Sequence, residues 1–482
     1  MKKILIIIIL MAVFNGASAV NTNPGGYGEA VILPYYTVNN NLNTVMTINN
    51  STEMTKAIKV HFREGREGKA VLTFNVYLGP NDIWAAALVP AVSTVFGHEG
   101  EDSVRLFFVD NSCAPFLFSG QEFLPFEVDA ESDDTDMLRS REGFIEVIEM
   151  GELDPVSGLG FDARPTANGD NNCANLEAAL AGGIWDEDNG GDLTAQLLPV
   201  NGGITANLGI IDVAEGVMFS VDGVALENFF PADSLFHTTT GETRIPSLNH
   251  ADTTSVVIND DGEPISTQWE HGYQAVSAVL MKYQLESFYD VEPNIAAKTE
   301  VVLTMPTKRF YLGSNLMVEQ PFTHLQTEQY YSCARYDTIV SDRDATNSHC
   351  STGPYGPGCY NNPEISTVKL TPIPPPVEMH LCYDVSVLQL LGEDSVPGFE
   401  GTQVLGSPYF DYRDVYSFQA GKLRLDLGQM VTSPSGEQYH GLPVLASTFT
   451  KYTNANAAPG LMAQYGGVHE VFYKTRVDPP AQ

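Results

Sequence analysis

The sequence predicts a mainly β protein with two immunoglobulin-like or β-sandwich-type domains, long acidic loops and one or two short helices. Gly and Pro account for 42 and 29 of the 482 residues, which is a turn-rich composition. Several short runs alternate apolar and polar residues with a period of two, as half-buried strands do. The strands are not separated by regular helices, so a parallel α/β sheet is not predicted.

The first domain is expected to cover residues 20–165. Strands are predicted at 31–38 and 44–48, followed by a hairpin of 56–64 and 71–78. Short strands at this spacing are typical of a sandwich.

The strand at 56–64 has a regular alternation that predicts which side chains are buried. Ile58, Val60 and Phe62 are expected to face a core, and the residues between them are expected to face water. His61 lies on the outward face, where the sequence predicts a solvated surface side chain.

Five basic residues gather around this hairpin in an otherwise acidic chain: Lys56, Lys59, Arg63, Arg66 and Lys69. They could dock acidic loops of a neighbouring molecule and cause self-association. The favoured interpretation is an ordinary solvated strand face that protects a sheet edge.

The next segment is strongly acidic, because residues 121–192 contain 19 Asp and Glu against three Arg. A strand is predicted at 143–150, and a short helix is predicted at 175–181, before two glycines. Residues 166–200 are expected to form an acidic, glycine-rich connection between the domains.

One acidic cluster in this connection suggests a calcium loop. Asp186 and Asp188 are alternate residues, and Asn189 and two glycines separate them from Asp192; hard carboxylate oxygens that converge on one cation would bind Ca²⁺. The twelfth position of an EF-hand count is Leu197, so the bidentate glutamate is missing. A generic acidic loop is the favoured alternative.

The second domain is expected to cover residues 201–482. It begins with a hairpin over 204–221, and residues 269–288 are the best candidate for a longer helix, with a strand as the alternative. A Pro- and Gly-rich loop stapled by disulfides is predicted at 329–382. Further strands are predicted at 299–305, 382–390, 422–427, 443–452 and 469–474.

The six cysteines predict three disulfides in an oxidising compartment. Cys113 and Cys173 are the natural pair in the first half. The four cysteines of the second half allow three connectivities, and nested bonds are favoured: Cys333 to Cys382 and Cys350 to Cys359. Zinc binding is disfavoured because the chain has no C-x-x-C motif.

The first 19 residues have the layout of a secretory signal peptide. Lys2 and Lys3 precede an apolar run over 4–14, and Ala17-Ser18-Ala19 forms a cleavage site. The apolar run is too short for a transmembrane anchor. The mature protein is therefore expected in the periplasm, on the outer surface or in the medium.

The charge of the chain limits its partners. Asp and Glu number 60 against 25 Lys and Arg, giving a formal net charge of −35. A general nucleic-acid binder needs a basic surface to contact phosphates, so nucleic acid is excluded as a partner. Self-association or binding to another surface component is compatible with this charge.

Several long segments resemble a family of uncharacterised exported proteins of Gram-negative bacteria. The segments are LPYYTV (33–38), KVHFREGREGKAVLTFNVYLGPNDIWAA (59–86), REGFIEVIEMGE (141–152), MPTKRFYL (305–312), and GLPVLASTF followed by LMAQYGG near the end. The resemblance implies export and a β-rich fold, and it supports pairing Cys113 with Cys173. It implies no activity, ligand or catalytic residue.

The expected function is a non-enzymatic surface or secreted protein with a structural, adhesive or assembly role. The common motifs of hydrolases, metalloproteases and nucleotide-binding enzymes are absent from the sequence. Two alternatives remain open: a secreted polysaccharide hydrolase with an Asp/Glu pair, and a periplasmic small-ligand-binding protein. No catalytic or cofactor-binding residue is predicted.

Overall fold

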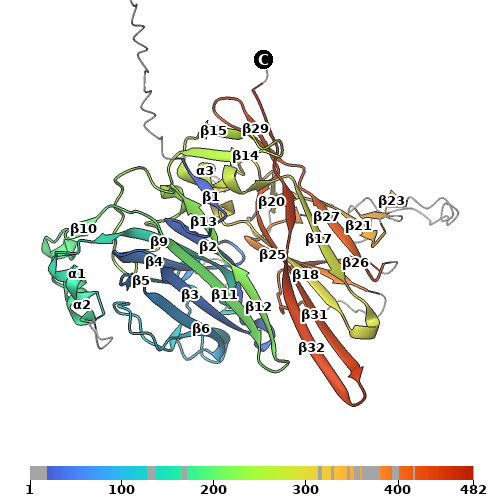
Figure 1. Ribbon diagram of the computed structural model, residues 1–482, viewed down its shortest axis with the longest axis horizontal. Helices are drawn as coiled ribbons and strands as arrows, with labels where there is room; N and C mark the ends of the chain where they lie inside the picture. The colour runs from blue at the N-terminus through green and yellow to red at the C-terminus, as the bar shows by residue number, and fades with distance from the viewer. Residues whose placement is uncertain are drawn as a thin grey trace, which may run out of the picture.

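The fold consists of two β-sandwiches that lie side by side (Figure 1). The computed structural model describes residues 19–127, 137–165, 171–312, 317–326, 331–344, 348–351, 359–360, 380–392, 401–415 and 418–480. Residues 1–18 of the predicted signal peptide and most of the predicted loop at 329–382 lie outside these ranges. No helix in the described part of the chain is long and apolar enough to cross a membrane.

The first sandwich packs two antiparallel sheets against each other. One sheet contains, in spatial order, β1 (Asn21–Asn23), β13 (Val224–Glu227), β2 (Ala30–Thr37), β9 (Glu142–Leu153), β4 (Thr55–Glu64) and β5 (Ala70–Leu78), with β10 (Leu197–Leu198) paired to β9. The other contains β12 (Val217–Asp222), β11 (Ile204–Asp212), β3 (Asn43–Asn50), β6 (Ile83–Val92), β7 (Asp102–Phe107) and β8 (Gln121–Glu122).

The second sandwich also consists of two sheets. One contains β23 (Cys359–Tyr360), β22 (Ser348–Ser351), β21 (Asp337–Asp342), β27 (Ala420–Asp426), β17 (Gln284–Asp290) and β33 (Phe472–Lys474). The other contains β26 (Phe410–Asp414), β25 (Val385–Leu391), β18 (Lys298–Thr304), β31 (Leu445–Ala458) and β32 (Leu461–Glu470).

Short elements complete the fold. The small sheets pair β14 (Thr254–Ile258) with β15 (Pro264–Gln268), β16 (Met281–Lys282) with β30 (Leu442–Pro443), β19 (His324–Gln326) and β24 (His380–Leu381) with β20 (Tyr331–Arg335), and β28 (Met430–Thr432) and β34 (Val477–Asp478) with β29 (Gln438–His440). The α-helices of the described residues are α1 (Gly158–Asp162), α2 (Cys173–Leu180) and α3 (Gly272–Leu280).

Most of the predicted strands are confirmed, including the β4–β5 hairpin and the β11–β12 hairpin. The helix predicted at 175–181 corresponds to α2. The helix predicted at 269–288 is only half correct, because α3 ends at Leu280 and β17 follows at Gln284. The strand alternative therefore holds for the second half of that segment, where Leu285 and Tyr289 point into the second core.

The predicted domain boundary at 201 differs from the observed pairing. Strands β11, β12 and β13 follow that boundary, but β11 pairs with β3 and β13 pairs with β2. The first sandwich is thus completed by residues up to Glu227. Between its two halves, residues 158–165 and 171–197 fold against the first sandwich, where Trp185 stacks on Tyr77 with ring centroids 5.7 Å apart.

The two sandwiches share a packed junction. Phe449 of β31 contacts the rings of Tyr35 and Phe219, at centroid distances of 6.1 and 5.5 Å. The hydroxyl of Thr304 donates to the backbone oxygen of Pro34 at 2.6 Å. This junction brings residues far apart in the sequence together around one cleft.

Candidate functional site

The outer face of β4 is buried, contrary to the sequence prediction. Lys59, His61 and Arg63 alternate with the core residues as expected, but His61 is fully buried and Arg63 is only 4% exposed. β4 pairs with β9 on one side and with β5 on the other, so it is not an edge strand and its basic residues do not protect a sheet edge. Among the five basic residues around this hairpin, Lys69 is the one that remains partly exposed.

A long segment between β13 and β14 covers this face. Lys59 Nζ donates to the carbonyl of Thr239 at 2.6 Å, and Arg63 Nη2 donates to the carbonyl of Thr243 at 3.0 Å. His61 Nε2 lies 2.9 Å from the carbonyl of Pro246. Burial, with Arg63 and Lys59 nearby, lowers the pKa of His61 well below its ordinary value, so the imidazole is neutral.

Glutamates of the neighbouring strand β9 neutralise the buried cations. Lys56 Nζ lies 2.9 Å from Glu149 Oε1 and 2.6 Å from Glu152 Oε1. Arg63 Nε lies 3.0 Å from Glu146 Oε2. Buried charges need partners of this kind because the interior solvates them poorly.

Glu146 also joins the two sandwiches. Its Oε1 lies 2.7 Å from Nη2 of Arg309, which belongs to the 3₁₀ turn Lys308–Tyr311 of the second sandwich. Burial alone would raise the pKa of Glu146, but the guanidinium groups of Arg309 and Arg63 hold it below its ordinary value. The carboxylate is therefore ionised and bridges two cations from different sandwiches.

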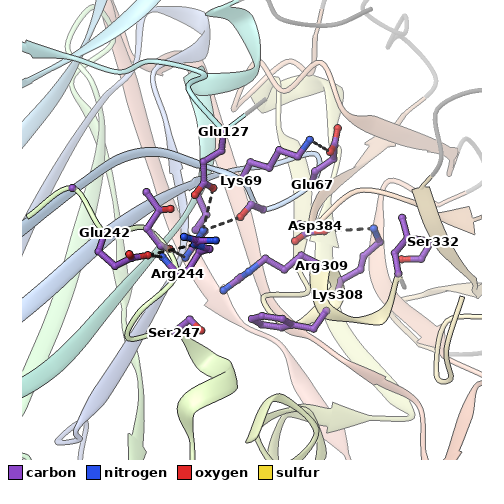
Figure 2. Close-up of a pocket in the computed structure, with 16 residues that line it drawn as sticks. Glu67, Lys69, Glu127, Glu242, Arg244, Ser247, Lys308, Arg309, Ser332 and Asp384 are labelled. Carbon is purple, nitrogen blue, oxygen red and sulfur yellow. Dashed lines mark hydrogen bonds and ion pairs between the residues drawn. The ribbon is translucent and has the colours of Figure 1, made fainter. Parts of the chain in front are cut away.

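A cleft of about 780 Å³ opens beside this bridge (Figure 2). Three parts of the chain form its walls: the turn between β4 and β5, the covering segment at 241–247, and the second sandwich near the 3₁₀ turn. Its ionisable lining residues are Arg63, Glu67, Lys69, Glu127, Glu242, Arg244, Lys308, Arg309 and Asp384. The cleft therefore holds five of the 25 Lys and Arg residues of the chain.

Backbone contacts fix the position of Asp384 at the cleft wall. The amide of Asp384 donates to the carbonyl of Arg66 at 3.2 Å, and the amide of Val385 donates to the carbonyl of Gly65 at 2.7 Å. Gly68 has a φ of +66°, and a Cβ there would lie 2.4 Å from Asp384 Oδ2. A side chain at position 68 would therefore collide with the carboxyl group.

Asp384 and Lys308 form a buried ion pair in which only one of the two carboxylate oxygens of Asp384 has a partner among the described residues. Lys308 Nζ lies 3.4 Å from Asp384 Oδ1. Asp384 Oδ2 makes no hydrogen bond within the described part of the chain. Burial raises the pKa of Asp384 to about 7 against the opposing effect of Lys308 and Arg309, and burial also lowers the pKa of Lys308.

The remaining cations of the cleft are more accessible. The side chain of Arg244 is 83% exposed and lies 3.6 Å from Glu242, and the side chain of Lys69 is 29% exposed and lies 2.6 Å from Glu67. In Figure 2, Arg309 and Lys308 extend from one side of the cleft and Arg244 lies on the other. Cations on facing walls can bind an oxyanion from both sides.

The cleft differs from the site of a glycoside hydrolase. Such an enzyme needs two carboxyl groups that flank the scissile bond. Each of the four carboxylates in this cleft forms an ion pair with a neighbouring Lys or Arg. Its lining includes one aromatic side chain, that of Phe310, so the geometry gives the hydrolase alternative little support.

The predicted calcium residues form a capped turn. Asp186 accepts hydrogen bonds from the Asp188 amide and from the Asn189 side chain, at 3.1 and 2.7 Å. Asp192 accepts from the Thr194 amide and hydroxyl. The described residues contain no group of three His, Cys, Asp or Glu side chains placed to hold a metal ion. Donors of the chain thus occupy both carboxylate oxygens of Asp186 and one of Asp192. The calcium loop stays a prediction.

Two of the predicted disulfides are present. Cys113 bonds to Cys173, which ties α2 to the first sandwich, and Cys333 bonds to Cys382. Cys350 and Cys359 lie opposite each other in the pairing of β22 with β23. Their side chains lie outside the described part of the structure, so this third bond remains a prediction.

Sequence reasoning missed the residues that the second sandwich contributes to the cleft. Lys308, Arg309 and Asp384 lie far along the chain from the β4–β5 hairpin, and no local pattern links them to it. The available signal was the adjacent Lys308-Arg309 pair, which is unusual in so acidic a chain.

Comparisons with protein-family models, with curated proteins and with solved structures found no match to this chain.

Proposed function

We propose that this chain is an exported, non-enzymatic binding protein that holds a small oxyanion, such as a carboxylate or phosphate group of a ligand, in the cleft between its sandwiches. The observation that carries the proposal is the concentration of basic residues there. The cleft contains five of the 25 Lys and Arg residues of a chain with a net charge of −35. Elsewhere the negative surplus would repel an anion, so the cleft is the favourable place for one.

The arrangement of these cations supports binding from both sides of the junction. Arg244 and Lys69 come from the first sandwich, and their side chains reach solvent. Arg309 comes from the second sandwich, and its side chain is 12% exposed. A ligand held by all three would bridge the sandwiches, and charge-assisted hydrogen bonds from guanidinium groups suit oxyanions.

Export is part of the same proposal. Its support is the signal-like sequence at 1–19, the two disulfides and the resemblance to exported proteins of Gram-negative bacteria. Fractionation of the native host into periplasm, outer surface and medium tests it. Recovery of the protein from the cytoplasm with residues 1–19 attached would contradict it.

The binding experiment uses purified mature protein with citrate and with inorganic phosphate as probes. A ligand that binds only the folded state stabilises it by about 2.7 kcal/mol at one hundred times its Kd. We expect millimolar citrate to raise the melting temperature and calorimetry to give a saturable isotherm. Arg244→Gln should weaken binding by up to about fivefold, since a charge pair made by an exposed side chain contributes at most about 1 kcal/mol.

A matched control separates specific binding from general salting effects. Lys422 lies on β27, away from the cleft, and its side chain is 44% exposed. Lys422→Gln should bind citrate as the wild type does. Equal thermal shifts in the wild type, Arg244→Gln and Lys422→Gln would mean that the anions act on the whole surface, and the proposal would fail.

An assembly role is the second candidate. Leu461 and Met462 are 57% and 56% exposed in the β31–β32 hairpin, where Tyr465 is also 46% exposed. Exposed apolar side chains of this size on an edge hairpin favour association. Light scattering after size-exclusion chromatography tests the assembly role. An oligomer that forms with increasing concentration, and that the double variant Leu461→Ser, Met462→Ser no longer forms, would support assembly. A monomer at all concentrations would oppose it.

A further inference from the structure

A second groove lies between the sandwiches, apart from the charged cleft. Two adjoining cavities of about 560 and 590 Å³ share part of their lining, including Asp222, Lys282, Glu470 and Tyr473. The walls come from β12 and β13 of the first sandwich and from the strands around β33 of the second. Both sandwiches thus line the groove.

Lys282 is one of the residues that line both cavities. It lies on β16, where it pairs with Leu442 of β30. Its Nζ is 4.0 Å from the centroid of the Tyr473 ring and 3.4 Å from the hydroxyl of Thr475. Within the described part of the chain it forms no ion pair, whereas Lys56 and Lys308 each contact carboxylates.

The surroundings of Lys282 leave its amine partly deprotonated near neutral pH. Burial lowers the pKa of Lys282 to about 8, although the charge of Asp260 opposes this change. Lys59 offers a contrast: burial lowers its pKa to about 7, but it is fully buried beneath Thr239 and no ligand can reach it. Lys282 is partly exposed and is a lining residue of the groove.

We infer that Lys282 is the covalent binding residue of a site for neutral aldehydes. The unprotonated Nζ attacks the carbonyl carbon, a C–N bond forms, and one proton moves from nitrogen to oxygen to give a carbinolamine. Loss of that hydroxyl and the remaining amine proton as water leaves a C=N bond. The step needs no oxidant or cofactor, and addition of water reverses it.

The charge of the groove selects the class of aldehyde. Asp222 and Glu470 are both exposed carboxylates on its rim. They would repel an aldehyde that carries its own carboxylate or phosphate, and an uncharged hydroxyaldehyde meets no such barrier. This inference is independent of the oxyanion cleft, because the two sites share no lining residue.

The test is reductive trapping on the intact mature protein. Glyceraldehyde is added at neutral pH with cyanoborohydride, and peptide mass spectrometry measures the label on each lysine. An amine with a pKa of about 8 is about one-tenth unprotonated at pH 7, against less than a thousandth for an ordinary lysine. We expect at least about tenfold more label on Lys282 than on Lys474, an exposed lysine of the neighbouring strand β33.

Saturation distinguishes a binding site from a reactive side chain. Labelling of Lys282 should level off as glyceraldehyde increases, and labelling of Lys474 should rise linearly. Glyoxylate, which is anionic, should label Lys282 less readily than glyceraldehyde does. Lys282→Arg should remove the saturable component, and Lys474→Arg should leave it intact.

The opposite outcomes overturn the inference. Equal label on Lys282 and Lys474 would mean that the groove confers no reactivity. Preferential but linear labelling of Lys282 would mean that the amine is reactive without a site for the aldehyde. Neither outcome depends on the folding of a variant, because both measurements are made on the wild type.

Discussion

Glu142 offers the most direct test of the physics at the junction. This residue begins β9 and is fully buried. Its carboxylate accepts hydrogen bonds from the Tyr35 and Ser407 hydroxyls, both at 2.7 Å, and from the Asn39 side chain at 3.3 Å. It makes no ion pair with any described residue, and Glu300 is a second buried carboxylate close enough to repel it.

The pKa of Glu142 predicts how stability changes with pH. Burial raises this pKa from 4.5 to about 7, against the hydrogen bonds from Ser407, Tyr35 and Asn39. The folded state therefore holds the proton more tightly than the unfolded state. The contribution of Glu142 to stability is therefore most favourable below pH 4.5, and it falls as the pH rises from 4.5 to about 7. At about 1.36 kcal/mol per pKa unit, the loss approaches about 3 kcal/mol above neutral pH.

Glu142→Gln removes the charge and keeps an oxygen that can accept from the hydroxyls. We expect the variant to exceed the wild type in free energy of unfolding by up to about 3 kcal/mol at pH 8 and by less than about 1 kcal/mol at pH 5. Urea unfolding followed by tryptophan fluorescence measures both values. Glu263→Gln, at an exposed residue of the β14–β15 turn, should change stability by less than about 0.5 kcal/mol at either pH.

Two results would refute this reasoning. A stability difference between Glu142→Gln and the wild type that stays constant from pH 5 to pH 8 would mean that Glu142 does not titrate in this range. A variant that is less stable than the wild type at pH 8 would mean that the ionised carboxylate stabilises the junction.

Three further predictions concern stability. Lys56→Met should lower the free energy of unfolding by about 3 to 5 kcal/mol, as measured by urea unfolding, because the substitution leaves two buried glutamates without their cation. A loss below about 1 kcal/mol would contradict a stabilising role for the ion pairs of Lys56. The double variant Cys113→Ser, Cys173→Ser should have a free energy of unfolding about 4 kcal/mol below that of the wild type, since the disulfide closes a 60-residue loop. Thermal unfolding with and without reductant checks this, and a wild type insensitive to reductant would argue against it. Gly68→Ala should lower the free energy of unfolding by more than about 1 kcal/mol and weaken citrate binding, because position 68 has a positive φ and the alanine Cβ would collide with Asp384 Oδ2. Urea unfolding measures the stability and calorimetry measures the binding. Unchanged stability and affinity would count against the proposed cleft geometry.

The charged cleft could not be predicted from local sequence patterns. Lys59 and Thr239 are 180 residues apart in the chain, as are Arg63 and Thr243. Arg309 and Glu146 are separated by 163 residues. Period-two alternation reports that two faces of a strand differ, but it does not report whether the polar face meets water or another part of the protein. For this reason β4 shows the predicted alternation, but its polar face is buried and not solvated as predicted.

The sequence by itself determined the mainly β fold, the hairpins and the pairing of Cys113 with Cys173, because alternation and turn residues act over short stretches and the first half of the chain has only two cysteines. The sequence left three connectivities open for the other four cysteines, and the structure shows the favoured bond between Cys333 and Cys382. Only the tertiary structure decided that β11 to β13 complete the first sandwich and that the basic face of β4 is covered. It also decided which cations and carboxylates meet at the junction. The physical reason is that burial of a charged side chain depends on partners brought by distant segments, and no local pattern records those partners.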